Sequence, residues 1–327
     1  MTPKILRENL FVLGFLSALL IVAFYDIFFL GKTFKLTTGN PQALISGPFG
    51  QQLNKPTYFP SQSTDVNTFE EPIYEFIKLS LKKGSLPLWN PYLGCGYPLI
   101  SMIHIGIFWP LNFFFYFLPQ KYGWDAMIFS RFLCAGIFTY WLMRVLRYRK
   151  IPSLGAAIIF MLSGPMILQQ YAFANVELTL PLLLLVFEFL IRKPNMRHCA
   201  FASIVLALTC IAGNPEHTFL VNVYGFLFFA YRLFTVRPRA DYGKAILYLT
   251  LACILSVGIS AFVLFPFLKD WVTEFWHTHP DNMGAVIEGK GKIKRTLLSL
   301  TFPHFYQKFP VTMDYARSSV IGHMGLF

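Results

Sequence analysis

Long apolar runs divide the chain into segments that are long enough to cross a membrane. The first extends from about Leu10 to Leu30, and six more cover roughly 124–143, 151–170, 176–191, 198–213, 217–234 and 244–268. A helix of about 20 apolar residues spans the hydrocarbon core of a bilayer. The pattern therefore predicts an all-α polytopic bundle with about seven transmembrane helices.

The first run follows Lys4 and Arg7, as the apolar region of a secretory signal peptide does. It is longer than that region, and no clear small-residue cleavage site follows it. We therefore expect residues 1–30 to form a retained first helix, and residues 124–268 to form a bundle of six more.

Lysine and arginine gather on alternate short connections between these runs. The connections at 169–177 and 213–217 contain neither residue. The others carry Arg144, Arg147, Arg149, Lys150, Arg192, Lys193, Arg197, Arg232, Arg237, Arg239 and Lys244. Basic residues are retained on the cytoplasmic side of a membrane. The N-terminus and every basic turn are therefore expected in the cytoplasm. This distribution explains much of the net charge of +12 without a nucleic-acid partner.

Composition agrees with a chain that is buried largely in lipid. Hydrophobic residues make up 55% of the chain and charged residues 13%, against about 25% charged residues in a soluble domain. The five cysteines form no CxxC pair, and all except Cys95 lie in apolar runs. A disulfide framework or a zinc site is therefore not indicated.

Two longer segments, 31–123 and 269–327, are expected outside the cytoplasm, and most acidic residues lie in them or at the outer ends of the runs. Within the first, residues 66–83 are predicted to form a helix that lies along the membrane surface and ends at Gly84. Its apolar face would consist of Ile73, Phe76, Ile77 and Leu81, with Lys78 and Lys82 on another face.

The run 99–118 is apolar enough to span, but His104 and Pro110 interrupt it. A single crossing there would invert every later loop and place the basic turns outside. We therefore expect an interfacial or re-entrant helix. The apolar residues at 321–327 resemble the start of another helix, so we expect the second outer segment to lead into one and the chain to be part of something longer.

An ordered set of motifs resembles the YfhO-type bacterial membrane proteins, from about residue 60 to residue 220. The matches are Asp65 seven residues before Pro72, Gly84-Ser-Leu-Pro-Leu-Trp-Asn-Pro91, Gly94, Gly96-Tyr-Pro98, Ile107-Phe-Trp-Pro-Leu-Asn112, Ser163-Gly164, Asn175, Pro181-Leu-Leu-Leu-Leu185 and Gly213-Asn-Pro-Glu216. Members of that family generally continue well beyond the length of this chain. The resemblance therefore implies a short or truncated member, multi-pass in the bacterial cytoplasmic (inner) membrane.

The resemblance also implies a GT-C-like architecture, with an extracytoplasmic first loop carrying interfacial helices. Such enzymes take a sugar from a polyprenyl-phosphate-linked donor and transfer it at the outer membrane surface. The acceptor here would be a cell-envelope glycan or lipid. The departing lipid phosphate needs a cationic partner, which is either a basic side chain or a divalent metal.

Asp65 fits the position of the catalytic acid in the first outer loop of GT-C enzymes. An acceptor hydroxyl loses its proton as it attacks, and a nearby carboxylate serves as base. Asp65 also stands where an N-cap residue is favoured. Glu70 and Glu71 are rival acids, although the first turn of a helix favours glutamates anyway. Glu216 is the second catalytic candidate, although the family often has glutamine or a related residue there.

Candidates for substrate binding are Arg131, His104, Trp89, Asn90 and His217. Arg131 lies inside an apolar run, where a charge either pairs with an acid or binds the lipid phosphate. His217 stands beside Glu216 at a break between two runs, and His104 interrupts another run. Trp89, beside Asn90, would stack on a sugar ring or anchor the loop at the interface.

Metal binding is not assigned, because His277, His279 and Asp281 lack ligands at a diagnostic spacing. Two other functions stay open at this point. A transporter or flippase of a lipid-linked substrate would show paired broken helices in two related halves. A non-catalytic membrane assembly protein would need no acid at all.

Overall fold

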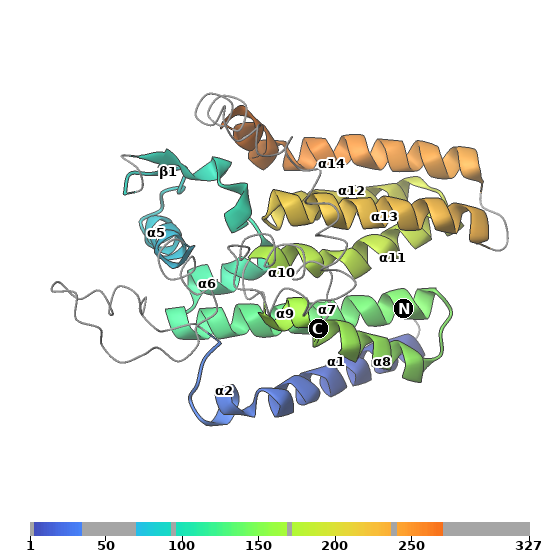
Figure 1. Cartoon of the computed structure of the whole chain (residues 1–327), viewed down its shortest axis with the longest axis horizontal. Coiled ribbons are helices and arrows are strands. Elements are labelled where there is room, and N and C mark those ends of the chain that lie inside the picture. Colours follow the sequence, from blue (N-terminus) through green and yellow to red (C-terminus); the bar gives the residue numbers. More distant parts are fainter. Residues whose placement is uncertain (1–2, 35–69, 93–95, 169–171, 237–240, 271–327) are drawn as a thin grey trace, which may run out of the picture.

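The computed structural model describes residues 3–34, 70–92, 96–168, 172–236 and 241–270, and these residues form a mainly helical bundle (Figure 1). The order of the elements is α1 (Pro3–Ala23), α2 (Tyr25–Phe29), α5 (Glu71–Lys82), β1 (Trp89–Asn90), β2 (Tyr97–Pro98), the short 3-10 helices η2 (Leu99–Ser101), η3 (Ile103–Ile105) and η4 (Pro110–Asn112), α6 (Phe113–Phe117), α7 (Gln120–Val145), α8 (Lys150–Met161), α9 (Gly164–Leu168), α10 (Ala172–Glu177), α11 (Thr179–Arg192), α12 (Met196–Ile211), α13 (Pro215–Thr235) and α14 (Tyr242–Asp270).

Five stretches of the described chain are helical, long and apolar enough to cross a membrane. They are Leu6–Ala23, Tyr122–Val145, Ala174–Arg192, Pro215–Thr235 and Tyr242–Asp270. The sequence predicts about seven crossings, and two of its runs fold as the shorter helices α8, with 12 residues, and α12, with 16 residues. At 1.5 Å per residue these helices reach about 18 and 24 Å, less than a hydrocarbon core of about 30 Å.

Both short helices end where the sequence interrupts the backbone hydrogen bonds. The run 151–170 breaks after Met161, because Pro165 has no N–H to donate to the Met161 carbonyl four residues earlier. Helix α12 ends before Gly213, which has φ +122° and therefore a conformation that side chains disfavour. Asn214 then caps α13 by accepting a hydrogen bond from the His217 N–H at 2.9 Å.

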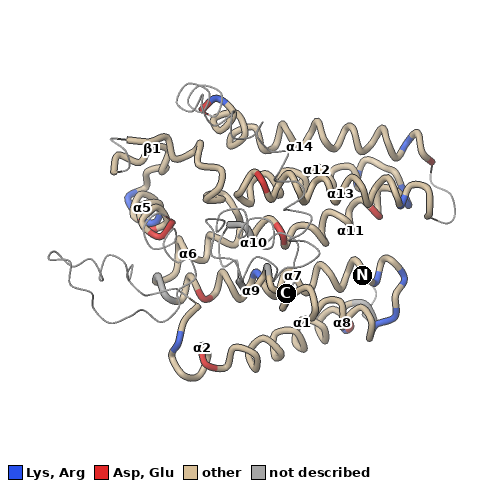
Figure 2. The backbone as a smooth tube through the Cα atoms, viewed as in Figure 1, with Lys and Arg blue, Asp and Glu red and all other residues tan. Residues whose placement is uncertain are grey.

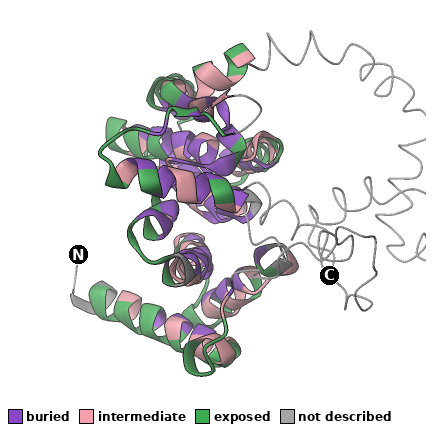
Figure 3. Ribbon diagram, turned by 90° about the vertical axis from the view of Figure 1, so that its left-hand side faces the viewer, coloured by how far each residue is buried: buried purple, intermediate pink, exposed green. Residues whose placement is uncertain are grey.

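Helix α11 lies at the centre of the bundle and packs against α7, α12, α13 and α14. Its side chains Leu183, Phe187 and Leu190 have no exposed surface. Gly225 of α13 meets it closely, since a Cβ at that position would lie 2.6 Å from Leu183 Cδ2. Large apolar residues on the outer sides of α1, α13 and α14 are exposed (Figure 3), as expected of helices that face lipid.

The basic connections lie together at one end of the bundle (Figure 2). Two carboxylates form ion pairs with basic residues of these connections. Glu188 is fully buried and accepts hydrogen bonds from Arg192 at 2.7 Å and from Arg232 at 2.6 and 2.8 Å. Glu8 of α1 pairs with Arg144 at 2.9 Å and with Lys150 at 2.8 Å. The N-terminal helix therefore starts at the same end as the basic turns.

At the opposite end, α5, the β1–β2 hairpin, the 3-10 segments and α6 form a small layer beyond the bundle (Figure 1). The helix predicted at 66–83 is confirmed over Glu71–Lys82, and Gly84 follows it with φ +72°. The expectation that Lys78 lies on a polar face is wrong. Its side chain is buried, with Nζ 5.8 Å from the centre of the Phe115 ring and 4.0 Å from Glu75, because α6 packs against that side of α5.

Residues 99–118, all of which the structure describes, differ from the single interfacial or re-entrant helix that the sequence predicts. They form η2, η3, η4 and the five-residue helix α6, and none of these reaches spanning length. Gly106 has φ +60°, and a Cβ there would lie 2.6 Å from the Ala212 carbonyl oxygen. This close approach locks the segment onto the turn between α12 and α13.

We expect the change Glu188→Gln to lower the free energy of unfolding by about 3 kcal/mol, because it removes a fully buried anion from two half-buried guanidinium groups. Thermal unfolding in detergent measures this loss. The control Asp241→Asn removes a pair with Lys244 whose side chains are 50% and 67% exposed, and should change stability by less than about 1 kcal/mol. Equal losses in the free energy of unfolding from the two changes would show that burial does not make the pairs of Glu188 stronger than the exposed pair.

The change Gly106→Ala is expected to destabilise the protein by at least about 1–2 kcal/mol, from the left-handed backbone alone, with a further loss from the contact with Ala212. The matched control is Gly155→Ala in α8, where a Cβ meets nothing within 4 Å and should stabilise the helix by about 0.5–1 kcal/mol. A stabilising effect at both positions would show that the segment is not held against the turn.

Candidate functional site

Arg131 lies in α7 with 1% of its surface exposed. Its Nε donates a hydrogen bond to Asn175 Oδ1 at 3.0 Å. A guanidinium group inside an apolar bundle is costly unless polar groups surround it. Asn175 lies on α10, which continues through the helical residue Leu178 into α11 at the centre of the bundle.

A second group of polar side chains comes from the layer beyond the bundle. The Tyr74 hydroxyl donates to the Ile105 carbonyl at 2.9 Å, and Asn112 Nδ2 donates to the Gly106 carbonyl at 2.7 Å. Burial raises the pKa of Tyr74 far above its usual value, and the negative charge of Glu70 raises it further, while the charge of Arg131 opposes both. Glu70 stands one helical turn before Tyr74, at the start of α5.

These five residues form what we call the Arg131 cluster: Glu70, Tyr74, Asn112, Arg131 and Asn175. All are buried. The cluster joins the acidic start of α5, in the first long loop, to a cation of α7. Glu70, Tyr74 and Asn112 belong to the layer beyond the bundle, whereas Arg131 lies near the middle of α7.

Two residues after Asn175, α10 contributes Glu177 to a pair with His217. The distance from Glu177 Oε1 to His217 Nδ1 is 3.2 Å, and His217 is buried while Glu177 is half-buried. Glu216, in the first turn of α13, is exposed, and a carboxylate there is favoured by the helix dipole. The pair and the Arg131 cluster are thus linked through one six-residue helix.

The structure brings some of the predicted site residues together and separates others. Arg131 and His217 lie in the groups just described, with Glu216 beside His217. Trp89 is exposed on the hairpin, and Asn90 is buried there, with its Oδ1 accepting a hydrogen bond from the Tyr92 N–H at 3.0 Å. The Asn90 side chain therefore stabilises the turn of the hairpin. Asp65 lies outside the described residues.

His104 lies on η3 and keeps exposed surface, although protein atoms crowd its ring. Their desolvation lowers the pKa of His104, which disfavours the charged form of the imidazole. Next to it is a shallow hollow, no larger than a water molecule needs, which is lined by Ile100, Met102, Ile103, Gly106, Ile107, Phe108, Ile211 and Val263.

Sequence reasoning did not assign a role to Tyr74, Asn112, Asn175 or Glu177. Of these four residues, only Asn175 and Glu177 stand out in the sequence, because they are two polar residues within three positions of an apolar stretch. Within the described ranges, no three or more His, Cys, Asp or Glu side chains gather as they would around a metal ion. The predicted loose cluster of His277, His279 and Asp281 lies outside these ranges.

The change Asn175→Leu is expected to lower the free energy of unfolding by about 1–3 kcal/mol, since it removes a buried hydrogen bond to a charged group. Asn175→Asp keeps an acceptor and adds a negative charge, so it should retain the stability that Asn175→Leu loses. Thermal unfolding in detergent compares the two. Equal loss in both variants would mean that shape, and not the bond to Arg131, matters at this position.

Comparison with models of protein families finds no match, and comparisons with curated proteins and with solved structures find none either. The chemistry of the described residues therefore carries the functional argument.

Proposed function

We propose that this chain is a membrane glycosyltransferase. It would move a sugar from a polyprenyl-phosphate-linked donor to a cell-envelope glycan or lipid on the extracytoplasmic face. The observation that carries the proposal is the buried guanidinium of Arg131, which lies inside an apolar bundle and is held by Asn175 of α10. Transfer of a sugar from a lipid phosphate needs an acid–base group and a cation of this kind.

The orientation follows from the charges at the other end. Basic turns stay in the cytoplasm, so the end that carries Arg192 and Arg232 is the inner one, and the N-terminus is cytoplasmic. The Arg131 cluster then faces the outer side. Nucleotide sugars remain in the cytoplasm, and a transferase on the outer side therefore needs a donor that crosses the membrane attached to its lipid.

The reaction requires two roles. A carboxylate takes the proton of the acceptor hydroxyl as the acceptor oxygen bonds to the anomeric carbon, and the bond from that carbon to the lipid phosphate breaks. We assign the base to Asp65, with Glu70 as the described acid closest to it in the chain. Arg131 stabilises the departing phosphate, and Glu216 is an accessory group beside the Glu177–His217 pair. A divalent metal would share the phosphate charge.

We expect Asp65→Asn to lower sugar transfer by about 10²–10⁴-fold, the usual contribution of a general base. The assay supplies the purified chain, reconstituted in lipid vesicles, with a range of polyprenyl-phosphate sugars and follows labelled sugar in the acceptor. Glu70→Gln and Glu71→Gln test the rival acids, and Glu75→Gln is the control on the same helix. Transfer at the parental rate in Asp65→Asn, Glu70→Gln and Glu71→Gln would overturn the proposal.

Transport of a lipid-linked substrate is the second candidate, favoured by one observation. Glu177 meets His217 beside the break between α12 and α13, at Gly213 and Asn214. Transporters place their polar sites at such interruptions. In sealed vesicles, movement of the lipid-linked sugar across the bilayer without its transfer to an acceptor would favour this candidate over the transferase.

A further inference from the structure

The outward side of α5 and the hairpin after it carry large apolar and aromatic side chains on the surface. Leu86 is 72% exposed, Trp89 55% and Tyr92 84%. We use the name hairpin platform for this surface, which consists of Phe76, Leu79, Leu86, Leu88, Trp89 and Tyr92. An exposed apolar surface of this kind on a folded protein marks an interaction site.

The platform has a defined shape before any partner arrives. Strands β1 and β2 are antiparallel, with Trp89 opposite Pro98 and Asn90 opposite Tyr97. The Trp89 ring lies directly on Gly96, where a Cβ would be 2.5 Å from Trp89 Cζ2 and where φ is +113°. The Tyr92 ring meets the Phe76 ring of α5 edge-on, with centroids 5.9 Å apart. These contacts connect the hairpin to the helix.

Helix α5 is apolar on its inner side as well. Ile73 and Ile77 are buried, and the helix packs against α6. A helix at the surface of a water-soluble protein usually turns a polar face outward. Here the outward face carries the half-buried Phe76 and Leu79, which is 48% exposed, beside the charged Glu75, Lys82 and Lys83. This mixture of apolar and charged side chains matches the boundary between lipid and water.

The charges nearest the hairpin are positive. Residues 79–92 contain no aspartate or glutamate, and Lys82 and Lys83 are exposed at the end of α5, whereas Glu75, beside Phe76, has a side chain that is 41% exposed. Tryptophan and tyrosine favour the boundary between lipid headgroups and hydrocarbon, and lysine attracts anionic headgroups. The exposed aromatic rings and lysines at the hairpin end of the platform fit the surface of an anionic bilayer.

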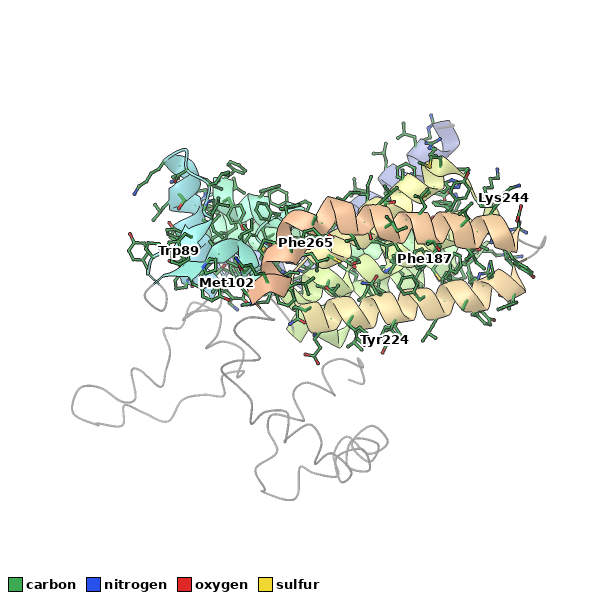
Figure 4. All side chains as sticks on the ribbon, turned by 90° about the horizontal axis from the view of Figure 1, so that it is seen from above. Trp89, Met102, Phe187, Tyr224, Lys244 and Phe265 are labelled. Atoms are coloured by element: carbon green, nitrogen blue, oxygen red, sulfur yellow. The ribbon has the colours of Figure 1, made fainter. Side chains whose placement is uncertain are left out.

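The platform continues a surface that already faces lipid. Strand β1 contacts η2, and both η2 and η3 pack against α14. Phe108 meets Phe262 of α14 with ring centroids 5.0 Å apart, and Phe265 is 60% exposed on the same helix. In Figure 4, Met102 of the connecting segment lies between Trp89 and Phe265. The outer side of a helix long enough to span the membrane thus leads, through this segment, to the hairpin.

We propose that the hairpin platform docks into the headgroup region of an anionic lipid bilayer and holds the layer beyond the bundle against the membrane surface. Trp89 and Tyr92 enter the boundary between headgroups and hydrocarbon, and Lys82 and Lys83 pair with lipid phosphates. This role is independent of any transfer reaction, and it assigns Trp89 to the membrane in preference to a sugar ring.

The test places an environment-sensitive fluorophore on a cysteine at position 92 of the full chain, with the five native cysteines replaced by serine. The protein is reconstituted in vesicles that contain phosphatidylglycerol. We expect blue-shifted emission, quenching by lipids that carry a nitroxide near the headgroup, and protection from iodide in the water. Quenching by iodide as strong as that of the free dye would overturn the proposal.

Charge reversal supplies the matched comparison. The double change Lys82→Glu and Lys83→Glu should reduce quenching by the nitroxide lipid in anionic vesicles and leave it unchanged in phosphatidylcholine vesicles. Lys193→Glu, an exposed lysine at the other end of the bundle, should have no effect on the probe. A probe protected from both quenchers would show that protein, either another part of this chain or a second copy, covers the platform, and would equally overturn the proposal.

Discussion

The carboxylate of Glu188 has no exposed surface and accepts hydrogen bonds from two guanidinium groups, one on its own helix and one on α13. In an apolar bundle such a group is tolerated only with its partners in place, because an isolated buried charge is far more costly than a buried pair. Glu8 does the same for α1, α7 and α8. These two acids determine which helices meet at the basic end.

Arg131, inside α7, is also a buried charge that needs a polar partner, but the partner of its Nε is a neutral amide and not a carboxylate. The Nε donates a hydrogen bond to the neutral amide of Asn175 on α10. The break at Gly213 and Asn214 presents His217 to Glu177. The break that ends α12 is therefore also the feature that brings this polar pair together.

The layer beyond the bundle connects the site to the surface. Its inner side supplies Glu70, Tyr74 and Asn112 to the Arg131 cluster, while its outer side carries the hairpin platform. Gly106 locks this layer onto the turn before α13. If the platform rests on lipid, the position of the membrane surface also sets the depth of the cluster, and a lipid-linked substrate would meet polar groups without leaving the bilayer.

The apolar runs by themselves determined that the described chain is a helical bundle with helices of spanning length, and the spacing of Lys and Arg determined which turns share an end. Gly84 also marked the end of α5, because a residue with positive φ leaves its signature in the sequence. The lengths of the apolar runs predicted more helices of spanning length than the described chain forms. A proline such as Pro165 shortens a helix only where no neighbouring group replaces the lost backbone hydrogen bond, and the sequence does not show whether one does.

Only the tertiary structure decided which polar residues meet. The helical pattern places Lys78 away from the apolar face of α5. In the structure α6 packs against that side of the helix, and the ammonium group of Lys78 lies over the Phe115 ring. Tyr74 and Asn112 look like ordinary residues along the chain, yet they bond to neighbouring backbone carbonyls near Arg131. Turns and close contacts bring these side chains to their partners, and the sequence does not contain the geometry of those turns. A sequence records which side chains are polar, whereas packing determines which of them share a buried volume.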